Sequence, residues 1–205
     1  MSAPTLYELA PADSGVYRAQ MLTLTEKNPY AAAVSVYGED EYRQMRLLIT
    51  DDGKAGVALK GDEIVSVFAH KDCAHPKAAQ SMLAQATALG GRRLDCFDTV
   101  LPDLYADAGF VPVARLKWND DYAPDGWDYN TFRAYNNGRP DVVFMAYNPD
   151  HVGGTYTPGA GEYVDDYEDG IARARQCCVT ASSTTAARPG AVRTTGGCAP
   201  RRHRS

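Results

Sequence analysis

The sequence predicts an α/β (α+β) fold in which a central mixed sheet is flanked by helices. Three features of the first 150 residues support this prediction. Short apolar segments separated by turn residues follow one another directly, which is typical of a strand meander. A helical segment then connects two strand-like segments at the length that a parallel crossover requires. Two more strand-like segments complete the sheet.

Two helical stretches are expected before the sheet. Apolar residues recur at helical spacing over 13–25, where Asp13 or Ser14 can cap the first turn. A second helical stretch is expected around 31–42.

The meander follows these helices. Its expected strands are Arg46–Thr50, Ala55–Lys60 and Glu63–His70, with turns at 51–53 and 61–62. The segment 65–68 (VSVF) suits a buried strand, because β-branched and aromatic residues pack well on a pleated surface.

A strand–helix–strand unit comes next. Pro76 is expected to open the helix, because a proline in the first turn lacks only an N–H that has no partner there. Gly90 and Gly91 are expected to end it, and Arg93–Phe97 is the following strand.

The last expected elements are a short helix and two strands. Asp98 or Thr99 caps the helix, which ends at Gly109. The strands are expected at 110–118 and 141–147, with an aromatic-rich loop at 119–138 between them.

Composition divides the chain at about residue 150. Residues 1–150 form the expected domain, and residues 151–205 are expected to be a Gly-rich linker followed by a disordered, Arg-rich tail. From Ile171 onward there is no aromatic residue, so the segment has little apolar area to offset the entropy of ordering.

Charge and cysteine content bound the partners and the compartment. The net charge of −5 divides into −12 for residues 1–170 and +7 for residues 171–205. The acidic body argues against a nucleic-acid partner, because phosphate binding needs concentrated positive charge. The five cysteines include no C-x-x-C pair, so no metal site is expected. No signal peptide or membrane-length apolar run is present, so a cytoplasmic location without membrane contact is expected.

The segment from Leu104 to Phe110 (LYADAGF) carries a family resemblance. Its L-Y-x-x-x-G-F pattern, between a strand and a strand that reaches Arg115, resembles the last helix and hairpin of the GNAT (Gcn5-related N-acetyltransferase) superfamily. The resemblance covers roughly residues 5–150. The later GWDY and NNGRPDVVFMAY segments resemble a branch found in bacterial and phage genomes.

The resemblance implies that acetyl-CoA, or another acyl-CoA, is the co-substrate. In the family it lies in a gap between the fourth and fifth strands, here Ile64–His70 and Arg93–Asp98. Backbone groups near Val67 and Phe68 would contact the pantetheine arm and polarise the thioester carbonyl. The helix that opens at Pro76 would bind the pyrophosphate through its first N–H groups.

The expected pyrophosphate loop, Ala74 to Ala79 (AHPKAA), departs from the family pattern Q/R-x-x-G-x-G/A. Ala79 matches the small last position, but Lys77 stands where glycine is expected and Ala74 where Gln or Arg is expected. Either lysines supply positive charge to the phosphates, or the site has lost its co-substrate. The expected co-substrate-binding residues are Val67, Phe68, Lys71, Lys77, Ala78 and Ala79.

Tyr105, Asp98 and Glu63 are the candidate catalytic residues. Tyr105 matches the tyrosine that protonates the departing thiolate in the family, although its place on an apolar helix stripe also suits a core residue. Asp98 and Glu63 stand at strand ends beside the expected gap, where a carboxylate can accept a proton from an amine. Asp98 also suits a helix cap, and Glu63 a turn. Cys96 is interpreted as a buried small residue, because no histidine is spaced to activate it.

The acceptor is expected to be an amine on a small molecule or a protein. Acidic and aromatic residues in the 119–138 loop suit a cationic acceptor, but they equally suit a structural lid. The chain is therefore predicted to be an acyltransferase. The alternatives are an inactive binding module with the same fold and an accessory factor that acts on modified nucleic acid.

Overall fold

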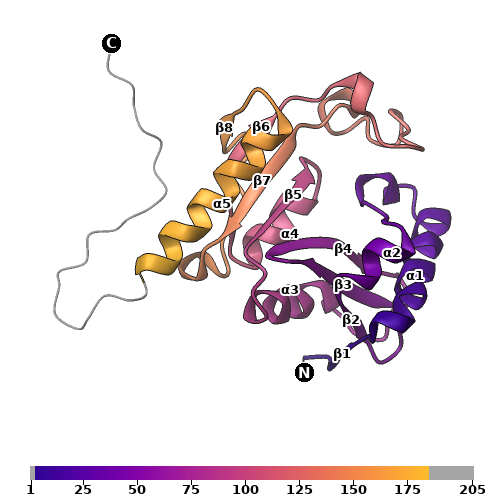
Figure 1. The fold of residues 1–205 in the computed structure, drawn as a ribbon. Helices are drawn as coiled ribbons and strands as arrows, with labels where there is room; N and C mark the ends of the chain where they lie inside the picture. Colours follow the sequence, from indigo (N-terminus) through magenta and orange to yellow (C-terminus); the bar gives the residue numbers. More distant parts are fainter. Residues whose placement is uncertain (1–2, 185–205) are drawn as a thin grey trace, which may run out of the picture.

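The computed structural model describes residues 3–184 and contains one eight-stranded mixed sheet (Figure 1). The strands are β1 (Leu6–Glu8), β2 (Arg46–Thr50), β3 (Ala55–Lys60), β4 (Glu63–Ala69), β5 (Arg93–Phe97), β6 (Phe110–Leu116), β7 (Val142–Tyr147) and β8 (Glu162–Tyr163). Their order in the sheet is β1-β2-β3-β4-β5-β7-β6-β8. The β4–β5 and β6–β8 pairs are parallel, and the other pairs are antiparallel.

Helices cover both faces of this sheet. They are α1 (Ser14–Lys27), α2 (Glu39–Arg43), α3 (Ala78–Ala88), α4 (Leu101–Asp107) and α5 (Tyr167–Thr184). Figure 1 shows α1 and α2 beside β2–β4, and α5 running along β6 and β7. Successive side chains in a strand point to opposite faces of the sheet. Side chains of β5 and β7 therefore pack with α3 and α4 on one face and with α5 on the other.

Two apolar clusters hold the layers together. Met82 and Leu83 of α3 pack with Leu94 and Phe110 of the sheet on one face. On the other face Tyr17 and Met21 of α1 pack with Tyr42, Leu47 and Phe68. Each fully buried side chain of this size contributes about 1.5–3 kcal/mol through the hydrophobic effect.

The expected fold class is confirmed, and the boundaries of single elements differ. The stretch expected as a helix around 31–42 is a short 3-10 turn, Ala31–Ala33, followed by an extended segment and by α2. Val34 and Val36 resist helix formation because β-branched side chains are restricted there, and Gly38 is extended. The three-residue strand β1 is an element that periodicity did not reveal.

The expectation of a linker and disordered tail from residue 151 is wrong for residues 151–184. Tyr156 is buried, β8 pairs with β6, and α5 packs against β5, β6 and β7. A Cβ on Gly170 would lie 2.3 Å from ring atoms of Phe144, so the helix rests directly on the sheet. Small residues permit this close packing, although they lowered the apparent hydrophobicity of the segment. Residues 185–205 of the expected tail lie outside the described residues.

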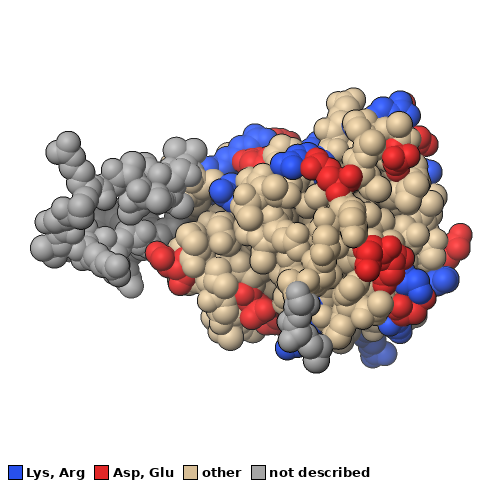
Figure 2. Space-filling view, turned by 90° about the horizontal axis from the view of Figure 1, so that it is seen from below, with Lys and Arg blue, Asp and Glu red and all other residues tan. Residues whose placement is uncertain are grey.

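Within residues 3–184, no helix is long and apolar enough to cross a membrane. On the face shown in Figure 2, basic side chains lie close to acidic ones and form no continuous basic surface.

Candidate active site

The parallel strands β4 and β5 diverge immediately after they meet. Glu63 and Arg93 at their first positions form the register pair between them. Beyond that pair the strands separate and leave a cleft of about 1950 Å³ in the middle of the sheet. Its lining combines residues of β4 and β5 with the 31–37 segment, the 116–125 segment and the start of α5.

A bulge at Ser66 shapes the β4 wall of this cleft. The pairing of β4 with β3 shifts register between Gly56 and Ala58, and Ser66 has a positive φ of 49°. A non-glycine residue in this conformation is strained, so its surroundings must hold it. The Tyr17 hydroxyl donates to the Ser66 carbonyl oxygen at 2.7 Å, and the Ser66 Oγ donates to the Ser35 carbonyl oxygen at 2.8 Å. The Tyr42 hydroxyl lies 2.8 Å from the same Oγ.

Gly56 on β3 accommodates the bulge from the neighbouring strand. A Cβ there would lie 2.5 Å from the Phe68 ring and 2.9 Å from the Leu48 carbonyl oxygen. Glycine at this position therefore lets β3 and the bulged part of β4 approach closely.

Tyr105 lines the cleft from the α4 side of the sheet. Its side chain is 8 % exposed and belongs to the apolar cluster that α3 covers. Burial raises the pKa of Tyr105 well above its ordinary value, so the phenol keeps its proton at neutral pH. Tyr105 is therefore packed in the core and also lines the cleft.

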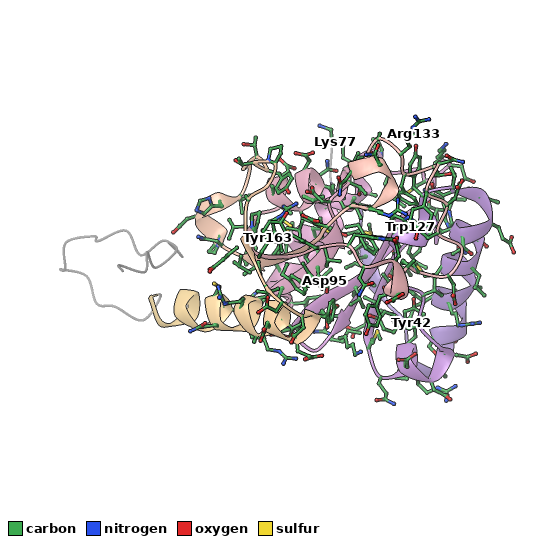
Figure 3. All side chains as sticks on the ribbon, turned by 90° about the horizontal axis from the view of Figure 1, so that it is seen from above. Tyr42, Lys77, Asp95, Trp127, Arg133 and Tyr163 are labelled. Carbon is green, nitrogen blue, oxygen red and sulfur yellow. The ribbon has the colours of Figure 1, made fainter. Side chains whose placement is uncertain are left out.

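Asp95 on β5 faces the same cleft from the opposite side of the sheet. Burial raises the pKa of Asp95 to about 6, and the nearby Glu63 carboxylate adds to this increase. The Tyr167 hydroxyl at the start of α5 donates a hydrogen bond to Asp95 Oδ1 at 2.9 Å. This hydrogen bond lowers the pKa of Asp95 and partly offsets the increase. Sequence reasoning missed Asp95, because a polar residue between apolar ones in a strand is typical of a side chain that faces solvent. Figure 3 shows Asp95 in the middle of the molecule.

Glu63 and Asp98 have different surroundings. Glu63 lines the cleft and forms an ion pair with Arg93 at 3.4 Å. Asp98 instead binds Arg115 and accepts a hydrogen bond from the Tyr156 hydroxyl at 3.0 Å. Among the residues that line the cleft, Asp98 is absent. The structure therefore groups Glu63 with Asp95 and Tyr105, and separates Asp98 from them.

Val67 and Phe68 differ in what they present to the cleft. Val67 lines it, whereas the Phe68 side chain is buried on the α1 face and packs edge-on against Tyr17 at a centroid distance of 5.3 Å. Phe68 is thus available to a bound molecule only through its backbone.

The N-terminus of α3 has a backbone conformation that glycine would favour. Lys77 stands in the position of the expected glycine, and it has the left-handed backbone conformation that glycine favours, with φ 57° and ψ 31°. No side chain caps the first turn of α3, so its N–H groups face outward without a side-chain acceptor. Lys71 and Lys77 are exposed, Ala78 is buried and Ala79 is partly buried. Figure 3 shows Lys77 on the opposite side of the sheet from Tyr42.

The preceding loop departs from an ordinary pyrophosphate site. The Ala74 N–H donates to Asp52 Oδ2 at 2.7 Å, so a carboxylate already occupies one anion-binding group. Its hydrogen bonds hold the pKa of Asp52 well below the usual range despite partial burial. His75 Nε2 lies 2.5 Å from Asp51 Oδ1. The residues thus fit a CoA co-substrate at the cleft and at α3, and diverge from that fit at Ala74.

The aromatic loop after β6 combines a structural role with a place in the cleft wall. Trp127 and Phe132 stack at a centroid distance of 3.8 Å, and Phe132 also contacts Tyr30 after α1 at 5.4 Å. The loop after β6 therefore contacts the segment after α1, on the other side of the gap between β4 and β5. Its first part, residues 119–122 together with 124 and 125, lines the cleft.

Three solved structures are similar to this chain. A GCN5-related N-acetyltransferase (aminotransferase, class II) from Rhodopseudomonas palustris has 19 % identity and a TM-score of 0.47, over 72 % of this chain and 97 % of the other. N-acetylglutamate synthase from Neisseria gonorrhoeae, in complex with coenzyme A and N-acetyl-glutamate, has 16 % identity and a TM-score of 0.43, over 72 % of this chain and 36 % of the other. Apo YjaB from Escherichia coli has 10 % identity and a TM-score of 0.42, over 71 % and 98 %. The sequence matches no protein-family model and no curated protein.

Proposed function

We propose that the protein transfers an acyl group from acyl-CoA to an amine. The observation that carries this proposal is one cleft lined by a protonated phenol, Tyr105, on one side of β5 and by a carboxyl of raised pKa, Asp95, on the other. A proton donor and a proton acceptor on opposite sides of one gap suit a reaction in which two substrates meet inside it.

The proposed reaction is a direct attack within a ternary complex. The amine nitrogen forms a bond to the thioester carbonyl carbon, and the carbon–sulfur bond breaks. Asp95, assisted electrostatically by Glu63, takes the proton that the amine loses. Tyr105 donates a proton to the leaving thiolate and regains one from solvent. Asp98 has a positioning role in this proposal, through Arg115.

The co-substrate would be held along β4 and at α3. Backbone groups of Val67 and Phe68 would bind the pantetheine arm, and the first turn of α3 would bind the pyrophosphate. Lys71 and Lys77 would add positive charge there, while Ala78 and Ala79 would keep the first turn free of bulky side chains. Acyl-CoA supplies the activated thioester, and the side chains named above supply proton transfer and orientation.

Calorimetric titration with acetyl-CoA tests the binding part of this proposal. Lys77→Glu is expected to weaken binding about tenfold or more, because it replaces an attractive charge beside the phosphates with a repulsive one. Arg175→Glu, an exposed charge reversal on α5, is the matched control and is expected to bind as the wild type does. Equal affinity of the Lys77 variant and the wild type would remove the phosphates from α3.

An inactive binding module is the second candidate, and the Asp52 bond to the Ala74 N–H favours it. Release of free thiol from acetyl-CoA in the presence of amines distinguishes the two. An acyltransferase releases thiol in proportion to the amine consumed, whereas a binding module releases none at any amine concentration.

A further inference from the structure

The cleft is lined by many more acidic than basic residues. Its acidic lining residues are Glu63, Asp95, Asp120, Asp121, Asp125, Asp165, Asp166 and Glu168. Lys117 is the one lysine or arginine among the described lining residues. Its Nζ lies 5.3 Å from the Tyr163 ring centroid, so the ammonium group rests against an aromatic face.

Most of these acids have no cationic partner among residues 3–184, which the structure describes. Glu63 pairs with Arg93, and Asp120 pairs with Arg139. The other six form no ion pair with any residue that the structure describes. Several like charges facing one concave space attract cations and raise their local concentration.

The acids are arranged at two depths. Asp95 lies inside, on β5, with Tyr167 as its hydrogen-bond donor. The unpaired acids of the outer part are exposed and come from two separate segments, Asp121 and Asp125 on the β6–β7 loop and 165–168 at the start of α5. A single ammonium group at Asp95 would leave the outer charges uncompensated.

We infer that the acceptor is a small aliphatic polyamine carrying at least two ammonium groups. One amine lies at Asp95, where it loses its proton and is acylated, and a second ammonium group lies between the outer acids and orients the molecule. Tyr37 and Tyr167 add aromatic faces in the same cleft, which also attract ammonium groups. This inference rests on the proposed function for the transfer step, but the binding of the polyamine is independent of it.

Calorimetry with spermidine, 1,4-diaminobutane and n-butylamine tests the inference without any turnover. The expected order of affinity is spermidine, diaminobutane and then butylamine, with at least tenfold between the first and the last at low salt. The preference is expected to shrink as salt is raised, because exposed charges are screened. Equal affinity for butylamine and spermidine would overturn the inference, as would tighter binding of a lysine-rich peptide than of spermidine.

A double variant that removes two of the outer negative charges tests where the second ammonium group lies. In Asp165→Asn/Asp166→Asn, spermidine affinity is expected to fall about tenfold while butylamine affinity is unchanged. Asn at position 166 keeps the oxygen that accepts the Asp169 N–H at 2.8 Å, so α5 keeps its cap. Asp13→Asn/Asp150→Asn removes two exposed charges that do not line the cleft and is expected to leave both affinities unchanged. A spermidine affinity equal to wild type in the first variant would overturn the inference.

The two proposals fail in distinguishable ways. Loss of acetyl-CoA binding together with retained spermidine selectivity would refute the transfer reaction and leave the polyamine site intact. Acetyl-CoA binding and thiol release without selectivity among the amines would refute the polyamine site alone.

Discussion

At the scale of residues, the chemistry of the cleft depends on the alternation of one strand. Asp95 and Cys96 are neighbours on β5 and therefore point to opposite faces, so Asp95 faces α5 while Cys96 packs with Tyr105 under α3 and α4. Burial raises the pKa of the Cys96 thiol well above its ordinary value, which keeps it inert. Tyr105 and Asp95, the proposed proton donor and proton acceptor, thus line one cleft from opposite faces of the sheet.

Tyr105→Phe separates the proposed catalytic role of Tyr105 from its packing role. The ring and its edge-on contact with Phe110 are kept, so the melting temperature is expected to change little. Binding of acetyl-CoA is expected to persist, and kcat is expected to fall on the order of 10²-fold, the usual contribution of a positioned acid. A wild-type kcat would make Tyr105 a core residue only.

Asp95→Asn is expected to abolish the acid limb of the pH–rate profile. With a pKa of about 6, Asp95 becomes a base as the pH rises through 6, so the rate in the wild type should rise over the same range. An acid limb that survives unchanged in the Asn variant would assign the base elsewhere.

The same group makes stability depend on pH. Because the folded-state pKa lies above the ordinary value of about 4, the native state binds more protons between pH 4 and 6. Stability is therefore expected to decrease as pH rises through this window. The decrease should be smaller in Asp95→Asn, as measured by urea denaturation at each pH.

At the scale of elements, α5 matters because it completes the cleft. Its first residue, Tyr167, reaches Asp95, and its small residues Gly170 and Ala174 are buried against the sheet. The helix therefore couples the packing of the C-terminal segment to the geometry of the candidate base.

Gly170→Ala is expected to destabilise the protein by about 1–3 kcal/mol, because the added methyl group overlaps the buried Phe144 ring. Gly15→Ala on α1 is the matched control. Its Cβ would meet only the Glu39 side chain at 3.5 Å, so the better helix propensity of alanine should stabilise the protein by up to about 1 kcal/mol. Denaturant midpoints of the two variants should move in opposite directions, and a shift of both in the same direction would contradict the packing of α5.

At the scale of the whole molecule, Arg115 ties the C-terminal segment to the sheet. The buried guanidinium donates to the Tyr156 hydroxyl at 2.7 Å and to the Ala160 carbonyl oxygen at 3.1 Å. It also pairs with Asp98 and Asp141 on the sheet side. Breaking such a buried pair leaves uncompensated charge, which costs several kcal/mol.

Truncation after Pro149 tests this coupling. It removes β8 and α5, exposes the Phe144 ring and deletes the Tyr156 partner of Arg115. A loss of roughly 3–5 kcal/mol is expected, or a fall in melting temperature on the order of 10 °C for a chain of this size. A melting temperature within about 2 °C of the full chain would mean that residues 151–184 contribute little to stability.

The sequence by itself determined the order and type of most elements between residues 13 and 147. The meander, the crossover helix and the helix ending at Gly109 all follow from local signals, since turn residues and periodicity act over a few positions. The family resemblance, rather than these local signals, placed Tyr105 and Glu63 beside the gap between the strands, and both residues line the cleft.

Only the tertiary structure decided which acids share the cleft and whether residues 151–184 pack on the sheet. Asp95 gains its raised pKa from burial and from Glu63, which lies 32 positions earlier on another strand. Asp98, equally plausible in the sequence, pairs with Arg115 because β6 brings that guanidinium beside it. The segment 151–184 lacks strong apolar periodicity, and its ordered structure depends on contacts with Phe144 and Arg115 of the sheet. Contacts between distant positions leave no periodic trace in a sequence, so these features depended on the fold as a whole.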